Sequence, residues 1–341
     1  MRVRQADIAR AVGISQPAVS VVLRGRGDQA GIPPGTQRRV WEVARRLGYA
    51  PNPVAQNLRG SETRLIGVHS FEAVFPLDRR DYYYEFLLGV EEQAEVEGYD
   101  LVLFTSTAGA ADRRRELFRD GVNRLRIADG SVLLGRSSQP DELARLAKES
   151  YPFVHIGRRD VPGARIPYVG CDYAGATEEA VSQLLRHGHR RLAYVGIHEP
   201  FEPQADRRRG FDRAVRRGSG LAVDMVELAE LTSEWLSSTI GGGTTALVVE
   251  SGNHAVTLAS LLAEQGIEVP AELSVVVLDQ GTPQQSGYPA WSRVTIPRAL
   301  MGREAVRVLV QGFGDSKSEQ ECPVLPCGHA GPESIAAPPR R

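Results

Sequence analysis

The chain has 341 residues, of which 42% are apolar, so it is long enough for two or three domains with buried cores. It contains no run of about 18 apolar residues, and its Arg-rich start does not resemble a signal peptide, so we expect no membrane segment and no export. Three cysteines are too few for a disulfide framework, and we expect a cytoplasmic protein.

The net charge of −1 hides an uneven distribution along the chain. Residues 1–60 contain ten Arg and no Lys, against the three acids Asp7, Asp28 and Glu42, which gives this segment +7 and leaves −8 for the remainder. A basic segment on an acidic body indicates an anion-binding module, most simply for nucleic acid. The alternative is that the arginines only solvate helix surfaces.

Residues 6–24 predict two short helices joined by a tight turn. Gly13 ends the first helix, Ser15 is suited to cap the second, and Pro17 falls in a first turn, where a missing N–H costs nothing. Such a pair is a helix-turn-helix, whose second helix fits the major groove of DNA, although spacing alone also allows an ordinary helical hairpin. The expected core positions are Ile8, Ala9, Val12, Val19, Val22 and Leu23.

A loop and a third helix follow. Residues 25–35 are rich in Gly and Pro, and their Gly-x-Gly follows a helix rather than a strand, which argues against a phosphate loop. Residues 36–47 predict a helix ended by Gly48, with Trp41 as a further core residue. Its apolar stripe consists of Val40, Val43, Ala44 and Leu47.

Residues 49–60 predict a short helix of about two turns, with Asn52 as its cap and Pro53 as its first residue. A helix of this length is not stable alone in water, so we expect it to be ordered only when it docks on something. The alternative is a plain tether between domains.

From residue 64 onward, strands alternate with helices in two successive series. This pattern is typical of parallel sheets covered on both faces, and two such halves predict a ligand cleft between them. The first series has strands at 64–71, 99–106, 130–135 and 151–158 and a helix at 82–98. The second has strands at 169–173, 190–196, 244–251 and 274–279 and helices at 175–187, 207–217 and 255–265.

Several motifs occur in a fixed order along residues 3–60: Asp7-Ile8-Ala9, Gly13-Ile14-Ser15, Ala18-Val19-Ser20, Gly48-Tyr49-x-Pro51-Asn52 and Ala55-Gln56-x-Leu58. Others extend to about residue 310: Leu87-x-Gly89-Val90-Glu91, Asp172-Tyr173-x-Gly175, His187-Gly188-His189-Arg190-Arg191, Gly210-Phe211, Gly266-Ile267-x-Val269-Pro270 and Leu273-Ser274-Val275. Together they resemble the lactose-repressor (LacI/GalR) family of bacterial transcription regulators.

The resemblance implies an all-α helix-turn-helix head and an α/β core of two periplasmic-binding-protein-like subdomains, connected by three crossovers. The implied boundaries are a head at 1–48, a hinge at 49–62, a first subdomain at 63–168 and 296–325, and a second at 169–295 and 326–341. It also implies a homodimer whose two heads, related by two-fold symmetry, read a near-palindromic operator.

The implied base contacts come from the start of the second helix. Gln16 can pair with adenine, whereas the side chains of Pro17 and Val21 cannot hydrogen-bond, so direct readout is limited. In the family, a leucine at the position of Leu58 wedges into the minor groove, although packing on the body is the alternative. The implied phosphate contacts are Arg4, Ser15, Ser20, Arg24 and Thr36, and the implied hinge contacts are Tyr49, Asn52, Ala55, Gln56 and Arg59. Affinity should fall steeply with salt.

The implied effector site lies in the cleft, with two arginines and a carboxylate that suit a sugar or a carboxylated ligand. Its residues are Phe75, Tyr82, Tyr83, Arg158, Arg207 and Asp279. The alternative for the arginines is that they pair with acids across the cleft. Ser251-Gly252 replaces a pair that usually carries an acid in the family, so one ligand contact is in doubt.

Other functions find little support in the sequence. The chain lacks a Gly-x-Ser-x-Gly elbow, a Walker loop and a His-Glu-x-x-His motif, and we expect neither an enzyme nor a cofactor. The spacing of Cys322, Cys327 and His329 fits no common zinc site. Residues 316–341 have no leucine heptads, so we expect no tetramerising helix. A solute-binding protein without a regulatory role is the rival interpretation.

Overall fold

The computed structural model describes residues 3–23, 25–49, 62–71, 80–105, 116–135, 139–197, 201–219, 221–281, 287–314, 322–331 and 333–339. The chain forms two compact units, residues 1–63 and residues 64–341, which are described separately. Within the described ranges, no helix combines the length and the apolar character that a membrane crossing needs.

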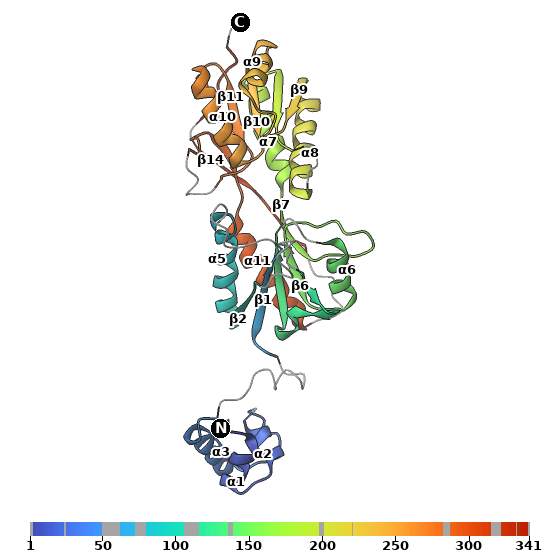
Figure 1. The fold of residues 1–341 in the computed structure, drawn as a ribbon, viewed down its shortest axis with the longest axis vertical. Coiled ribbons are helices and arrows are strands. Elements are labelled where there is room, and N and C mark those ends of the chain that lie inside the picture. The colour runs from blue at the N-terminus through green and yellow to red at the C-terminus, as the bar shows by residue number, and fades with distance from the viewer. Residues whose placement is uncertain are drawn as a thin grey trace. The chain divides into compact units, whose positions relative to one another are not determined.

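In the described residues of the first unit, which we call the head, three helices pack around a shared apolar core (Figure 1). Gly13 closes α1 with a φ of 79°, and the Ser15 hydroxyl accepts the N–H of Ala18 at 3.3 Å, as expected for the cap of the second helix. The helices are α1 (Gln5–Val12), α2 (Gln16–Val22) and α3 (Pro34–Arg46). The predicted core residues of α1 and α2 are all buried, and Val40 and Ala44 of α3 complete the cluster.

The third helix corrects two predictions. It begins at Pro34 rather than at residue 36, because proline is compatible with the first turn of a helix. Trp41 is 40% exposed and does not contribute to the core. It follows Val40 directly, and one residue turns the side chain by about 100° from the apolar stripe. Leu47, at the C-terminal cap, is also exposed.

The loop between α2 and α3 is tied to α3 by one side chain. Gln37 donates from Nε2 to the Asp28 carboxylate at 2.9 Å and to the Ile32 carbonyl at 2.7 Å. A Cβ on Gly27 would lie 2.4 Å from the end of the Gln37 side chain, so a larger residue there would displace the Gln37 amide from these contacts. The loop therefore has a defined path between the two helices.

The second unit contains two six-stranded sheets. The first has the order β13-β7-β6-β5-β1-β2. Helices α5 and α11 pack with Ile66, Val90 and Val132 on one face, and α6 packs with Leu133 and Phe153 on the other. The strands are β1 (Leu65–Ser70), β2 (Asp100–Phe104), β5 (Gly130–Leu134), β6 (Phe153–Ile156), β7 (Tyr168–Cys171) and β13 (Val324–Leu325). The helices are α5 (Arg80–Glu97), α6 (Pro140–Lys148), α11 (Arg298–Gly314) and the 3-10 turn η1 (Arg124–Ile127), and β3 (Phe118–Arg119) pairs with β4 (Val122–Asn123).

The second sheet has the order β14-β12-β11-β10-β8-β9, and only β14 runs antiparallel to its neighbour. Helices α7 and α8 cover the face of Leu192 and Val276, and α9 and α10 cover the face of Val195 and Val277. The strands are β8 (Arg191–Val195), β9 (Leu221–Val226), β10 (Ala246–Val249), β11 (Ser274–Val277), β12 (Ser292–Thr295) and β14 (Gly328–Ala330). The helices are α7 (Tyr173–Arg186), α8 (Glu202–Arg217), α9 (Ser233–Gly241) and α10 (Gly252–Gln265).

The assignment of β7 to the second series was wrong. This strand pairs in parallel with β6, with Ile156 opposite Val169, and therefore ends the first sheet. Its short apolar sequence carries no information on which sheet it joins. The chain then crosses to the second sheet after β7, returns between β12 and α11, and crosses again between β13 and β14. These three crossings are the covalent connections between the two subdomains.

Helices α5 and α11 approach closely through two glycines. A Cβ on Gly89 would lie 1.9 Å from the Ala299 carbonyl oxygen, and one on Gly302 would lie 2.2 Å from the Phe86 carbonyl oxygen. Both obstacles are backbone atoms, which a rotamer change cannot move aside. The two helices therefore hold this spacing only with glycine at both positions.

Gly89→Ala is expected to destabilise the 64–341 unit by about 1–3 kcal/mol, because α5 and α11 must separate to admit the methyl group. Gly241→Ala is the matched control, since a Cβ there meets nothing within 4 Å. Urea unfolding of both variants measures the difference. Equal stability of the two variants would contradict the close approach.

Candidate nucleic-acid interface and ligand site

The start of α2 presents an exposed surface. Ser15, Gln16 and Pro17 are exposed, and Val21, one turn further along, is half-buried. Because Gln16 lies in the first turn, its amide is free to reach outward from the helical cluster. The predicted base-reading residues therefore lie together at one helix end.

Ser20 is the exception among the predicted DNA contacts. It is only 6% exposed and lies in the interior of the head beside Val19. On a helix that packs through residues 19, 22 and 23, position 20 turns partly toward the same face. A contact from this hydroxyl to a phosphate is therefore not supported by its position.

The head carries its positive charge on its surface. Thr36 is half-buried at the start of α3, and Tyr49 packs against the helical core. Arg10 pairs with Asp7 at 3.1 Å. The described arginines of the head are all exposed, namely Arg4, Arg10, Arg26, Arg38, Arg39, Arg45 and Arg46. Some predicted site residues lie outside the described residues. They are Arg24, Asn52, Ala55, Gln56, Leu58 and Arg59 of the predicted DNA contacts and Phe75 of the predicted effector site.

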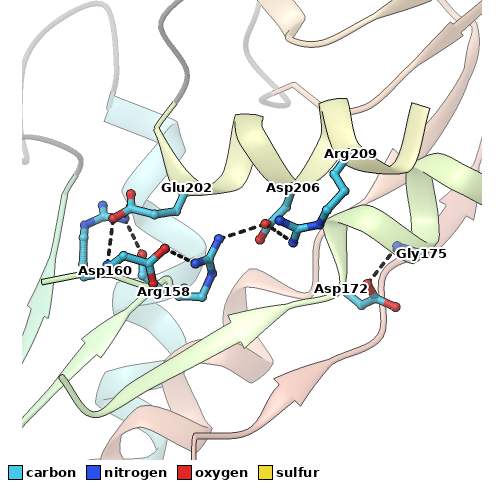
Figure 2. Close-up of polar contacts among 8 residues, drawn as sticks. Arg158, Asp160, Asp172, Gly175, Glu202, Asp206 and Arg209 are labelled. Atoms are coloured by element: carbon cyan, nitrogen blue, oxygen red, sulfur yellow. Dashed lines mark hydrogen bonds and ion pairs between the residues drawn. The ribbon is translucent and has the colours of Figure 1, made fainter. Parts of the chain in front are cut away.

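In the second unit, an ionic network joins the segment after β6 to helix α8 of the other subdomain (Figure 2). Arg158 donates to the Asp206 carboxylate at 2.8 Å and also pairs with Asp160. Arg209 reaches the same Asp206 oxygen at 2.5 Å. Burial opposes the charge of Arg158, but Asp160 and Asp206 outweigh it and raise the pKa of its guanidinium. The predicted alternative, pairing across the cleft, is what Arg158 does here.

Arg159 strengthens the same junction. Its guanidinium donates to Glu202 of α8 at 3.1 Å and to the Gly135 carbonyl at 2.6 Å, and Glu202 also accepts the backbone N–H of Asp160 at 3.1 Å. Two consecutive arginines thus bind two carboxylates one helical turn apart on α8. The pairs hold the two subdomains together through charge rather than through apolar packing.

A cavity of about 190 Å³ lies beside this network. Arg158, Asp206 and Arg209 supply its charged wall, and Asp172 caps α7 by accepting the N–H of Gly175 at 2.8 Å (Figure 2). Both signs of charge line one small space, which suits a polar ligand that donates and accepts hydrogen bonds. Of the predicted effector residues, Arg158 lines this cavity.

A second cluster of charged residues surrounds Arg298 at the start of α11. Its guanidinium donates to Asp279 at 2.8 Å and to the Gly281 carbonyl at 3.0 Å, lies 3.5 Å from Glu85, and stacks over the Tyr82 ring at 4.9 Å. Asp279 follows β11, whereas Tyr82 and Glu85 belong to α5. The cluster therefore also bridges the two subdomains, and Asp279 is already occupied by an arginine.

Arg207 of α8 is a buried arginine, 7% exposed. Its guanidinium stacks on the Tyr173 ring at 4.5 Å, and its Nε has no hydrogen-bond partner among the described residues. Burial opposes its charge, but Tyr173, Asp279 and Glu250 outweigh burial and raise the pKa of Arg207. A buried donor without a partner is costly, so it marks a place where a ligand acceptor would be favourable.

Tyr83 does not belong to this site. It is 3% exposed and lies in the core of the first subdomain, whereas Tyr82 is half-buried under Arg298. Adjacent residues on a helix point about 100° apart, so the pair cannot both face a ligand. The expectation that both rings contact the effector was wrong for Tyr83.

Sequence reasoning missed several residues of this region. Glu250 is buried at the end of β10, where it accepts from the Tyr194 hydroxyl at 3.3 Å and from the Ile197 N–H at 3.2 Å. Its place at the carboxyl end of a parallel strand is a signal in the sequence that could have identified it. Arg298 and Asp206 gave no comparable signal, because each lies on a helix.

Comparisons with known proteins agree with this architecture. Residues 69–241 match a family model described as periplasmic binding proteins and sugar binding domain of the LacI family, and residues 181–330 match a periplasmic binding protein-like domain. The HTH-type transcriptional regulator CelR of Thermobifida fusca is 28% identical over 92% of both chains. A solved complex of a transcriptional regulator CelR with cellobiose covers 98% of this chain and 100% of its own, at 24% identity and a TM-score of 0.65. A lac repressor dimer bound to operator and an anti-inducer covers 99% of this chain and 100% of its own, at 20% identity and a TM-score of 0.73.

Proposed function

Because this chain belongs to the LacI family, with a family model matching residues 69–241, we propose that it is a DNA-binding transcriptional regulator controlled by a small effector. The effector binds between the two α/β subdomains, and the regulator acts as a repressor. The observation that carries the proposal is the combination in one chain of a basic helix-turn-helix head, with Gln16 exposed at its reading end, and a two-subdomain ligand-binding core.

The head supplies both components of operator recognition. Exposed arginines attract phosphates without regard to sequence, and Gln16 offers a donor and an acceptor to an adenine edge. A single three-helix head is a small module, so we propose that a homodimer reads two half-sites of a near-palindromic operator. Such a regulator acts where the chromosome lies, in the bacterial cytoplasm, and needs no catalytic residue.

The effector is proposed to be a sugar or a sugar derivative. Hydroxyl groups accept from arginine and donate to carboxylates, and the junction offers both through Arg158, Asp206 and the Arg207 Nε, for which the described part of the chain supplies no acceptor. A ligand that competes for these groups changes which contacts join the two subdomains. The equilibrium shifts only as far as the effector's affinity differs between the two arrangements.

The regulatory step is proposed to be an order–disorder change of residues 52–59. Reorientation of the subdomains would alter the spacing of the two hinge segments in a dimer, so that they no longer remain helical in the minor groove. A two-turn helix is only marginally stable, which makes it sensitive to such a change.

DNase footprinting of the full chain on DNA from upstream of its own gene, with and without a panel of sugars that includes cellobiose, tests the proposal. A protected site of two-fold symmetry that one sugar weakens or strengthens is the expected result. Protection that no sugar alters would reject the sugar but keep the regulator. No protection at low salt would reject the regulator itself.

Gln16→Ala is expected to lower operator affinity by about 1–3 kcal/mol, roughly 5- to 150-fold, because one bidentate base contact is lost. The salt dependence should stay steep and unchanged, since the arginine contacts to phosphate remain. Titrations by fluorescence anisotropy at several salt concentrations measure both quantities. Gln93→Ala, the same change on α5, is the control and should leave affinity unaltered. A loss that appears equally on unrelated DNA would contradict base reading by Gln16.

A further inference from the structure

Two thiols meet where the chain crosses between the subdomains. Cys171 is the last residue of β7, and Cys327 lies between β13 and β14, so each belongs to a different crossing. Their sulfur atoms are 2.9 Å apart, and Leu325 pairs in register with Cys171. A disulfide has an S–S distance of about 2.0 Å, so a shift of about 1 Å would suffice to form one. None of the chain's three cysteines is in a disulfide.

We propose that Cys171 and Cys327 are a peroxide-responsive dithiol. Its oxidation to a disulfide links two of the three crossings between the subdomains covalently to each other. The proposal rests on the position of the two sulfur atoms and does not depend on the identity of the effector or of the operator.

The surroundings assign different roles to the two thiols. The two thiols share a hydrogen bond. This bond, helped by the charge of Arg207, lowers the pKa of the Cys327 thiol although burial opposes it. The same hydrogen bond and burial raise the pKa of Cys171. Cys327 is also the more accessible of the two, half-buried where Cys171 is buried. Cys327 is therefore the attacking thiolate and Cys171 the resolving thiol.

The chemistry balances with hydrogen peroxide as the oxidant. The Cys327 thiolate attacks one peroxide oxygen, the O–O bond breaks, and the other oxygen leaves as hydroxide, which takes a proton to become water. The resulting Cys327 sulfenic acid is attacked by the Cys171 sulfur, which gives up its proton, and hydroxide leaves as a second molecule of water. Both thiols are oxidised and the peroxide is reduced.

The position of the bond determines its consequence. β7 and β13 lie side by side, with the Gly170 N–H donating to the Pro323 carbonyl at 2.8 Å and the Asp172 N–H donating to the Leu325 carbonyl at 2.9 Å. A covalent link directly beyond these hydrogen bonds prevents the two strands from separating or sliding where they enter the second subdomain. Oxidation should therefore restrict any reorientation that requires the crossings to move independently.

Mass spectrometry of the full chain after hydrogen peroxide treatment tests the proposal directly. The expected result is a loss of about 2 Da, restored by dithiothreitol, together with a non-reduced peptide pair that links Cys171 to Cys327. Titratable thiols should fall from three to one. A pair linking Cys322 to Cys327, a link between two chains, or no disulfide would each overturn the proposal.

Variants separate the roles of the thiols. Cys322→Ser is the matched control and should form the same disulfide as the unaltered chain. Cys171→Ser should stop at a sulfenic acid on Cys327, captured by dimedone, and Cys327→Ser should show no oxidation at Cys171. Amide hydrogen exchange of the unaltered chain should be slower in peptides covering residues 168–173 and 322–330 after oxidation. Unchanged exchange at a fully formed disulfide would overturn the restriction of the crossings.

Discussion

Arg298→Ala should destabilise the 64–341 unit by about 3–5 kcal/mol, because it removes one member of a buried ion pair and leaves the other without compensation. The Arg298 side chain is 1% exposed. It pairs with Asp279, donates to the Gly281 carbonyl and stacks over the Tyr82 ring. The Asp279 carboxylate lies in a largely buried position, so water cannot replace the lost donor cheaply. Urea unfolding followed by circular dichroism would measure the loss.

The same helix offers a control for this substitution. Arg303 of α11 pairs with Glu92 of α5 at 2.6 Å, but these side chains are 40% and 47% exposed. Arg303→Ala should therefore cost no more than about 1 kcal/mol, the usual value of a solvated pair. If the two variants lost the same amount, burial of the Arg298 cluster would not be the cause. Arg298→Lys should recover only part of the lost free energy of unfolding, since one ammonium group cannot make the acid, carbonyl and ring contacts of the planar guanidinium together.

The elements that follow from local patterns were predictable from the sequence. In the head, Gly13, Ser15 and the spacing of Ile8, Val12 and Val19 determine where the helices begin, end and pack, and all of this involves residues close in sequence. Helices α5, α7, α8 and α10 of the core and the strands β1, β2, β5, β6, β7, β8, β10 and β11 were found for the same reason, whereas α6, α9, α11 and the remaining strands were not assigned from the sequence. The sheet that β7 joins was not predictable, because its pairing with β6 on one side and β13 on the other depends on a chain return about 150 residues later.

The candidate ligand site was predicted only in part, and the errors share a cause. Arg158, Arg207 and Asp279, which the resemblance selected as effector residues, are charged residues with ionic partners, but the resemblance gave no partners for them. The partners Asp206 and Arg298 lie on helices, where an acid or an arginine is ordinarily an exposed residue. Tyr83 failed because one helical position separates a core ring from a ring at the junction.

Charge pairing at the junction suits the proposed regulation, which requires two arrangements of the core with similar energy. Arg158, Arg159 and Arg298 each join the subdomains through carboxylates, and an ion pair costs nearly as much to desolvate as it gains. Replacing these ionic contacts with ligand contacts has a small net free-energy cost. Separating an apolar interface would instead expose its apolar surface to water. The arrangement is consistent with control by a polar effector.

The stability of the core should fall as the pH decreases below about 6.5, because buried histidines must remain neutral in the folded chain. Burial lowers the pKa of His155, His189 and His254, and the charge of Arg159 lowers that of His155 further. The unfolded chain therefore binds more protons than the folded chain below this pH. Stability is complete above pH 6.5 and is lost as the pH decreases, with a limiting slope of about 1.4 kcal/mol per pH unit for each histidine.

His155 should contribute one full proton to this dependence, and its environment shows why. Its Nδ1 donates to the Gly157 carbonyl at 2.8 Å, which leaves Nε2 unprotonated, and this atom is buried without a hydrogen-bond partner among the described residues. A proton there would place a second positive charge near Arg159 with no acceptor to receive it. His155→Asn keeps a donor for Gly157 but cannot be protonated. Urea unfolding between pH 7 and 5.5 should therefore show a lower slope in this variant, with a difference that approaches about 1.4 kcal/mol per pH unit only toward the acid end of this range. An unchanged slope in His155→Asn would mean that the folded chain already accommodates the charge, and that the burial of this imidazole has no bearing on acid stability.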